Sequence, residues 1–340
     1  MKVLVVDDAR MMRRVIADVV TAAGHDVVGE APDGATALGL IPRLRPDLIT
    51  LDIEMPGMSG IDVLRHVMAN TPTKTILVSS LTTAGADITL EGLSLGAVDF
   101  VPKPSALTGL DGFTDHLEHT LRAAVHARLR ATHGSPGRRS VSPRPAGGSI
   151  RVPRLMVVAS STGGPDALTR FFGAFSSAPT APVLVVQHMP PEFTGRLAAR
   201  LDSRMPFSVV EAVDNDRVAP GKVLIAPGNR HLGYRPGRVT LLDTPAIGRL
   251  RPAADVTLEQ VAHEVGSETL VVVLSGMGKD GLEGSRRVVE AGGQVIAQDA
   301  ETSAVYGMPR AVVEAGLATL VASPEELAGA VERATRRGAA

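Results

Sequence analysis

The chain has no cysteine and no tryptophan among its 340 residues. Without cysteine it forms no disulfide, binds no metal through thiolates and has no thiol nucleophile. Its charges nearly cancel, with 35 Lys and Arg against 36 Asp and Glu, so the basic excess typical of nucleic-acid-binding proteins is missing. No apolar run reaches the roughly 18 residues of a membrane span, and carboxylates follow the first short apolar stretch at once, unlike a signal peptide. These absences favour a cytoplasmic protein with no membrane insertion and no nucleic-acid partner.

The overall composition of the chain is typical of a folded protein. Hydrophobic residues make up 44% of the chain and charged residues 21%, which allows a sizeable core. With only 7 Phe and 2 Tyr, that core must consist mainly of Val, Leu, Ile and Ala. At roughly 150 residues per domain, the length predicts two domains.

One segment interrupts the apolar pattern. In residues 132–150, 11 of 19 residues are Gly, Pro or Ser, and seven arginines with no acid lie between Arg128 and Arg154. Three prolines in this stretch prevent a regular helix, so we expect a flexible linker. A docking segment for an acidic partner is the alternative. Ahead of it, a stripe of apolar residues at spacings of four predicts a helix over residues 111–130.

On both sides of this segment, short apolar runs alternate with helical patterns. The first half has runs at 3–6, 27–29, 48–51, 76–79 and 97–101, with helical patterns at 10–23, 34–44, 60–70 and 85–95. The second half has buried-strand candidates at 155–159, 183–186, 223–225, 270–274 and 294–297, and a hairpin or edge strand at 238–242. This alternation predicts two α/β domains, each with a doubly wound parallel sheet. Pro42 is expected to end or kink the second helix.

The first domain places acids at the ends of its strands. Asp7 and Asp8 follow the first strand and Asp52 ends the third, so all three should meet at one edge of the sheet. Such a cluster is stabilised by a hard cation such as Mg²⁺. Ser79 and Lys103 follow two further strands and could hold the oxygens of a phosphoryl group on a carboxylate. The alternative is that Asp7 and Asp8 only cap the first helix.

The second domain places a serine, a histidine and an aspartate after three strands. Ser161 lies in a Ser-Ser-Thr-Gly-Gly-Pro turn, where backbone N–H groups at a helix start can bind a phosphate or an oxyanion. His188 follows the next strand, and Asp280 follows a later one between glycines. These are the parts of a nucleophile, base and orienting carboxylate. Nucleotide binding by the same turn is the alternative, although the sequence has no Gly-x-Gly-x-x-Gly fingerprint.

The first 125 residues resemble the receiver domain of two-component response regulators. The resemblance rests on VLVVDDARMMRR, LDIEMPGMSGIDVL, ILVSSLT and GAVDFVPKP. It implies a flavodoxin-like fold that is phosphorylated at Asp52 by a histidine kinase. It also implies a set of further roles: Mg²⁺ held by Asp7, Asp8, Asp52 and the Glu54 carbonyl, a switch hydroxyl at Ser79, a switch aromatic at Phe100, the ammonium of Lys103, and a cis bond before Pro104.

Residues 155 to 317 resemble the catalytic domain of chemotaxis protein-glutamate methylesterase. The motifs are ASSTGGPDAL, VVQHMPPEFTGRLA, VDNDRVAPGKVLIAPGNRHL, RPAADV, VVVLSGMGKDGLEG and AQDAETSAVYGMPRAV. This resemblance implies a Rossmann-like three-layer domain without a cofactor of its own. It also implies the site residues: Ser161 as nucleophile, His188 as base, Asp280 as its partner, and backbone N–H groups of Thr162 and Met277 as oxyanion donors. Ser160 leaves open which hydroxyl attacks.

Together the two resemblances imply a receiver domain over 1–125, a linker over 126–150 and a methylesterase domain over 151–340. The implied activity is phosphorylation-activated demethylation of glutamate methyl esters on methyl-accepting chemoreceptors, with deamidation of receptor glutamines. We expect a monomer in which the unphosphorylated receiver domain blocks the catalytic edge. The alternatives are a phosphorylation-controlled binding module without turnover and an unrelated serine hydrolase that acts on a small ester.

Overall fold

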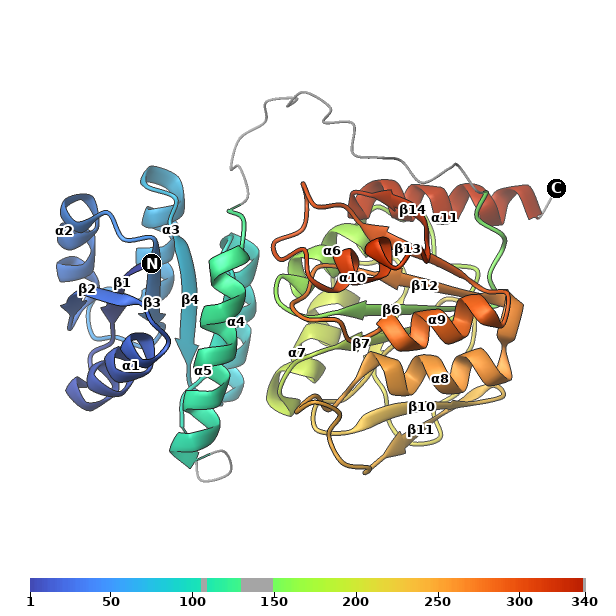
Figure 1. Cartoon of the computed structure of the whole chain (residues 1–340), viewed down its shortest axis with the longest axis horizontal. Helices are drawn as coiled ribbons and strands as arrows, with labels where there is room; N and C mark the ends of the chain where they lie inside the picture. Colours follow the sequence, from blue (N-terminus) through green and yellow to red (C-terminus); the bar gives the residue numbers. More distant parts are fainter. Residues whose placement is uncertain (105–108, 130–148, 339–340) are drawn as a thin grey trace. The chain divides into compact units, whose positions relative to one another are not determined.

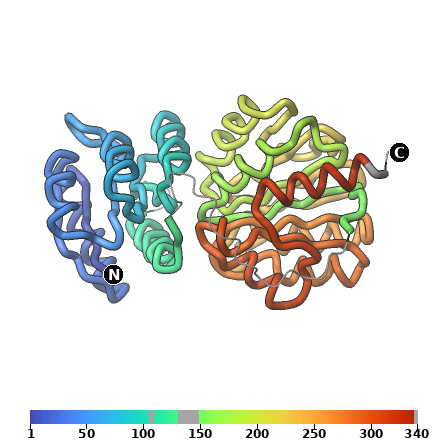
Figure 2. Tube along the Cα trace, turned by 90° about the horizontal axis from the view of Figure 1, so that it is seen from above, coloured from blue at the N-terminus to red at the C-terminus, as the bar shows by residue number. Residues whose placement is uncertain are grey.

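The computed structural model describes residues 1–104, 109–129 and 149–338, which form two units with a parallel sheet in each (Figure 1). The first unit lies within residues 1–137 and the second within residues 138–340. The colours along the trace in Figure 2 show that each unit is built from one continuous stretch of chain. Most of the expected linker, residues 130–148, lies outside the described residues.

The first unit is a doubly wound sheet of five parallel strands in the order β2-β1-β3-β4-β5. This is the flavodoxin-like order, so the predicted fold class is confirmed. The strands are β1 (Lys2–Val6), β2 (Asp26–Ala31), β3 (Leu48–Asp52), β4 (Lys74–Ser79) and β5 (Asp99–Pro102). The helices are α1 (Arg10–Ala22), α2 (Gly34–Leu44), α3 (Gly60–Asn70), α4 (Thr83–Leu95) and α5 (Gly109–His126).

Short polar side chains fix where three of these helices begin. Asp33, Ser59 and Thr82 each accept a hydrogen bond from the backbone N–H three residues later, at the starts of α2, α3 and α4. Each of them satisfies an N–H group that has no partner inside the helix. At the other end of α4, Gly96 takes a left-handed conformation with φ 112° and stops the helix.

Two helix expectations differ from the structure. The helix before the linker ends at His126 rather than near residue 130, and Val125, expected on its core stripe, is 40% exposed. Phe113, Leu117 and Leu121, which belong to the same predicted stripe, are buried as expected. Pro42 does not end α2 at once, since the helix continues for two residues to Leu44; the proline lies in the last turn, where it removes only the N–H that would bond the Leu38 carbonyl.

The second unit contains a parallel sheet of seven strands in the order β14-β13-β12-β6-β7-β9-β8 and a separate antiparallel hairpin of β10 and β11. The strands are β6 (Leu155–Ser160), β7 (Val183–Gln187), β8 (Ser208–Glu211), β9 (Lys222–Ile225), β10 (His231–Arg235), β11 (Arg238–Leu242), β12 (Thr269–Val273), β13 (Gln294–Gln298) and β14 (Ala318–Ala322). The helices are α6 (Gly164–Gly173), α7 (Pro191–Asp202), α8 (Ala254–Glu264), α9 (Leu282–Glu290), α10 (Met308–Glu314) and α11 (Pro324–Gly338), with a 3₁₀ turn at Gly266–Glu268.

The strand order reverses between β6 and β12. From β6 the chain continues to β7 on one side, whereas from β12 it continues to β13 and β14 on the other. Doubly wound sheets bind ligands at such a reversal, beyond the carboxyl ends of the strands, so the loops that follow β6 and β12 lie at the expected place for a site. In the first unit the same reversal falls between β1 and β3.

The sequence pattern missed β8 and β14, the two edge strands of this sheet. Both are only partly buried, so neither has the continuous apolar run that marks a strand covered on both faces. The hairpin expected at residues 238–242 is present as β10 and β11.

The apolar residues are concentrated in the two sheets. β3 of the first unit and β6, β7 and β12 of the second are buried along their whole length. Within the described ranges, no helix combines the length and the hydropathy that crossing a membrane requires.

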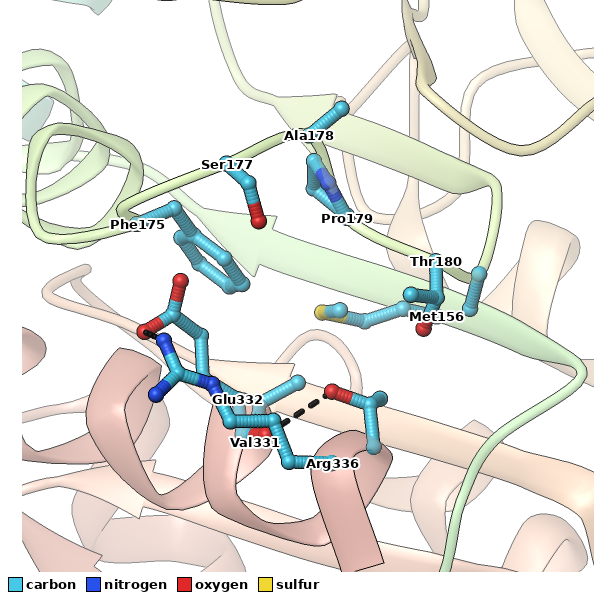
Figure 3. A pocket seen from close by; sticks show the side chains of 11 residues that line it. Met156, Phe175, Ser177, Ala178, Pro179, Thr180, Val331, Glu332 and Arg336 are labelled. Carbon is cyan, nitrogen blue, oxygen red and sulfur yellow. Dashed lines mark hydrogen bonds and ion pairs between the residues drawn. The ribbon is translucent and has the colours of Figure 1, made fainter. Parts of the chain in front are cut away.

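A small cavity opens at the amino-terminal ends of β6 and β7 (Figure 3). Its volume is about 150 Å³, and Met156, Phe175 and Glu332 are among its lining residues. Glu332 accepts hydrogen bonds from the backbone N–H and the hydroxyl of Ser176. The catalytic candidates follow the opposite ends of these strands, so the cavity is not part of their site.

The close approach of α3 to the first sheet can be tested at Gly60, the first residue of this helix. An added Cβ would lie 2.0 Å from the carbonyl oxygen of Asp52, so Gly60→Ala should destabilise this unit by about 1–3 kcal/mol. Gly39→Ala, a matched control in α2 with no neighbouring atom within 4 Å of the added Cβ, should stabilise it by about 0.4–1 kcal/mol. Hydrogen exchange of the β1 and β3 amides in the full chain measures both changes. Equal protection in the two variants would contradict this packing.

Candidate functional site

Three carboxylates meet at the carboxyl end of the first sheet. One oxygen from each of Asp7, Asp8 and Asp52 lies within 4.8 Å of the others. Asp7 and Asp52 are fully buried, whereas Asp8 is exposed. The strand ends that the sequence pattern predicted to be neighbours therefore bring these side chains together.

Lys103 supplies the positive charge in this cluster. Its Nζ lies 2.7 Å from Oδ2 of Asp52 and 3.8 Å from Oδ2 of Asp7. Burial raises the pKa of Asp7 to about 6, helped by the negative charge of Asp52 and opposed by Lys103. Burial also raises the pKa of Asp52, although the hydrogen bond from Lys103 opposes this. The positive charge of Lys103 therefore balances the negative charges of these carboxylates only in part.

The cluster has the features of a site for a hard cation. Oδ2 of Asp7 is buried and forms no hydrogen bond with any described residue, while Oδ1 accepts the Ala9 N–H at 2.9 Å. Convergent carboxylate oxygens are the donors that Mg²⁺ prefers. The backbone N–H of Glu54 donates to Oδ1 of Asp52 at 3.1 Å, which fixes the start of the loop whose carbonyl was expected to complete the site. These residues fit Mg²⁺.

Ser79 and Phe100 were expected to contribute to this site, but each of them contacts another residue. The Ser79 hydroxyl is fully buried and accepts a hydrogen bond from Oγ1 of Thr89 in α4 at 2.6 Å. Phe100 is 3% exposed and lies beside the ring of His116. The expected cis bond before Pro104 is wrong, because the cis peptide bond of the described chain joins Arg251 and Pro252.

In the second unit, His188 and Asp280 form a direct contact at the strand reversal. Nε2 of His188 lies 2.7 Å from Oδ2 of Asp280, and both side chains are less than one tenth exposed. Ser161 follows β6, the strand between theirs in the sheet, and is 7% exposed. Its backbone N–H donates to the carbonyl of Ser275 at 3.0 Å, and the His188 N–H donates to the carbonyl of Ser160 at 3.1 Å. These bonds hold the three loops side by side.

The carboxylate of Asp280 is held by the start of α8. Its Oδ2 accepts the Ala254 N–H at 2.6 Å and its Oδ1 accepts the Asp255 N–H at 3.1 Å. Burial alone would raise the pKa of Asp280, but the hydrogen bond and charge of His188, together with these two N–H groups, lower it. A buried carboxylate that receives three hydrogen bonds stays ionised. Sequence reasoning missed this contact.

The two neighbouring serines differ in their surroundings. The Ser160 hydroxyl is fully buried and donates to Oε1 of Gln187 at 2.7 Å. Nε2 of Gln187 in turn donates to the carbonyls of Ser161 and His188, each at 3.0 Å. Ser160 therefore belongs to a buried network, whereas Ser161 is 7% exposed.

Glycines let the loops around Ser161 approach one another. A Cβ on Gly276 would lie 2.9 Å from Cβ of Ser161 and 2.3 Å from the sulfur of Met308. The Gly276 carbonyl accepts the N–H groups of Gly307 and Met308, which places the Tyr-Gly-Met-Pro segment against this loop. Within the described residues, the N–H of Met277 donates to no other group.

Comparison with known proteins places these two units in one family. The family model described as CheB methylesterase matches residues 156–331, and the model described as response regulator receiver domain matches residues 3–112. A protein-glutamate methylesterase/protein-glutamine glutaminase of Symbiobacterium thermophilum is 44% identical over 354 residues, which cover 99% of this chain and 98% of that protein. The chain belongs to the CheB methylesterase family.

Other CheB proteins support the same assignment. A relative of the same description from Thermotoga maritima is 43% identical and covers 94% of each chain. The crystal structure of the Thermotoga maritima CheB methylesterase catalytic domain matches with a TM-score of 0.51 and 44% identity, over 53% of this chain and 98% of that one. The resemblance read from the motifs is therefore confirmed, as is a receiver domain ahead of a CheB domain.

Proposed function

We propose that this chain hydrolyses γ-glutamyl methyl esters on methyl-accepting chemoreceptors, releasing methanol, and deamidates receptor glutamines, under the control of its receiver domain. The observation that carries the proposal is the His188–Asp280 pair beside Ser161 at the strand reversal of a CheB domain. The names of the relatives support the substrate class. Receptor signalling regions and their kinase would be met in the cytoplasm.

The reaction begins with the Ser161 hydroxyl. Its oxygen attacks the ester carbonyl carbon while His188 accepts the hydroxyl proton. Because Nε2 of His188 faces Asp280, Nδ1 is the nitrogen that receives this proton. Asp280 stabilises the imidazolium that results. His188 then protonates the departing methoxide, and methanol leaves a Ser161 acyl ester.

Water completes the cycle by the same route. His188 takes a proton from water, and the hydroxide attacks the acyl carbon. The bond from this carbon to the Ser161 oxygen then breaks, Ser161 takes the proton from His188, and the glutamic acid product releases its remaining proton to solvent. With a glutamine substrate, ammonia leaves in place of methanol. The backbone N–H groups of Thr162 and Met277 stabilise the oxyanion in both steps.

The receiver domain supplies control by phosphorylation. Asp52 accepts the phosphoryl group from a phosphohistidine of a chemotaxis histidine kinase, with the P–N bond breaking as the P–O bond forms. Mg²⁺, held by Asp7, Asp8, Asp52 and the Glu54 carbonyl, would offset the charge of the transferred group. Lys103 already lies 2.7 Å from Asp52. Ser79 reaches a phosphoryl oxygen only after it leaves Thr89.

We also keep the expected division into a receiver domain over 1–125, a linker over 126–150 and a methylesterase domain over 151–340, in a monomer. The unphosphorylated receiver domain keeps the activity low, and phosphorylation at Asp52 raises it. A binding module without turnover and a hydrolase of small esters are the outcomes that the following measurements would reveal instead.

Ser161 and Ser160 provide a matched test of the nucleophile. Ser161→Ala should lower methanol release from a methylated receptor fragment on the order of 10⁶-fold, because the attacking oxygen is lost. Ser160→Ala removes only the bond to Gln187 and should cost no more than about tenfold. Headspace detection of methanol measures both. Near-normal release by the Ser161 variant would remove this residue from the mechanism, and no release by the unmodified chain would favour a binding module.

Control by the receiver domain is tested with a small-molecule phosphodonor and Mg²⁺. The donor should raise methanol release by the full chain, and either chelation of Mg²⁺ or Asp52→Asn should abolish the increase while leaving the basal rate. Asp26→Asn, which replaces an exposed acid at the start of β2, is the control and should respond like the unmodified chain. An Asp52→Asn variant that still responds to the donor would contradict phosphorylation at this residue.

A further inference from the structure

Asp280 lies between the starts of two helices, and Asp255 contacts both of them. Asp255 is in the first turn of α8, and its backbone N–H is one of the two that hold the Asp280 carboxylate. The Asp255 side chain points to the other helix, where its Oδ1 accepts the N–H of Gly284 at 2.7 Å. Gly284 lies in the first turn of α9, which begins two residues after Asp280. Asp255 therefore links the starts of α8 and α9 directly across the loop that carries Asp280.

The packing between α8 and α9 makes this link stiff. A Cβ added to Gly284 would lie 2.4 Å from Cβ of Leu258 and 3.2 Å from Cα of Asp255. The helix backbones thus approach as closely as a glycine permits. Gly281, with φ 87°, turns the chain from Asp280 into α9. Any change in the separation of the two helix starts would move the Asp280 carboxylate relative to His188.

We propose that Asp255 is a positioning residue for the His188–Asp280 pair, acting through the hydrogen bond between its carboxylate and α9. It does not touch substrate in this role. This inference rests on the proposed function, because it concerns the base of that reaction. A displacement of about 1 Å in such a constellation can cost on the order of 100-fold in rate.

The charge of Asp255 adds a second way to detect this role. Burial raises the pKa of Asp255 to about 6, with the charge of Asp280 adding to the rise and the Gly284 N–H opposing it. The groups that face it are Asp280 from the loop after β12, with His188 behind it, and backbone N–H groups from α9. As pH falls through about 6, Asp255 takes up a proton, and the hydrogen bond that it accepts from the Gly284 N–H loses its charged acceptor. Asp255→Asn removes this titration, because an amide oxygen is a neutral acceptor at every pH.

Two substitutions separate the hydrogen bond from the charge. Asp255→Ala removes the acceptor for Gly284 and should lower kcat for methanol release about 10- to 100-fold with KM unchanged. Asp255→Asn keeps an oxygen acceptor and should retain kcat within several-fold, while its pH profile loses the contribution that titrates near pH 6. Glu283→Ala is the matched control, since Glu283 is an exposed acid in the same turn of α9, and it should change neither quantity.

The outcomes are decisive even if Asp255→Ala fails to fold, because the Asp255→Asn profile stands alone. A pH profile of Asp255→Asn identical to that of the unmodified chain, or an unchanged kcat in a folded Asp255→Ala, would overturn the proposal. Failure of the proposed function is recognised separately, as no methanol release by the unmodified chain. In that event, the rate at which a fluorophosphonate labels Ser161 replaces methanol release: a slower rate in Asp255→Ala than in Glu283→Ala supports the proposal, and equal rates overturn it.

Discussion

The contact between His188 and Asp280 depends on how the protein stabilises a buried carboxylate. Taking a carboxylate out of water is costly unless hydrogen bonds and opposite charge replace the lost hydration. At Asp280 the compensation comes from His188 and from two backbone N–H groups at the start of α8. These N–H groups have no partner inside the helix, and the helix dipole favours a negative charge there. A carboxylate held in this way stays ionised and keeps the histidine ring in one orientation.

The first unit also contains buried carboxylates, but the protein supplies less opposite charge and fewer hydrogen bonds to stabilise them. Asp7 and Asp52 are fully buried, yet in the described part of the chain only Lys103 forms ion pairs with them, and the pKa of both acids is raised. Asp280, by contrast, has a lowered pKa. This difference corresponds to the chemistry proposed for each unit. A site that is to receive a cation and a phosphoryl group remains under-compensated, whereas a site that must orient a base is complete within the protein.

Sequence reasoning predicted the features that follow from parallel sheets. The carboxyl ends of parallel strands share an edge, so residues after β1 and β3, or after β6, β7 and β12, were expected to be neighbours, and the structure brings them together. Sequence reasoning could not predict contacts that are set by tertiary packing. Ala254 and Asp255 lie more than 20 residues before Asp280, and no periodicity indicates which helix start will meet that carboxylate. The Ser79 rotamer depends on Thr89 in the same way, and the edge strands β8 and β14 lack the burial on both faces that produces a clear apolar run.

The protonation of the His188 ring tests the central claim most directly. Nitrogen-15 NMR of histidine-labelled protein at neutral pH reports which ring nitrogen carries the proton, and His188→Gln identifies the signals. His231 is an internal reference, because its Nδ1 accepts the Ala253 N–H and its Nε2 faces the Pro245 carbonyl, which fixes the proton on Nε2. For His188 we expect the proton on Nε2, toward Asp280, and an unprotonated Nδ1 that can accept the Ser161 proton. A proton on Nδ1 with Nε2 unprotonated would contradict the account.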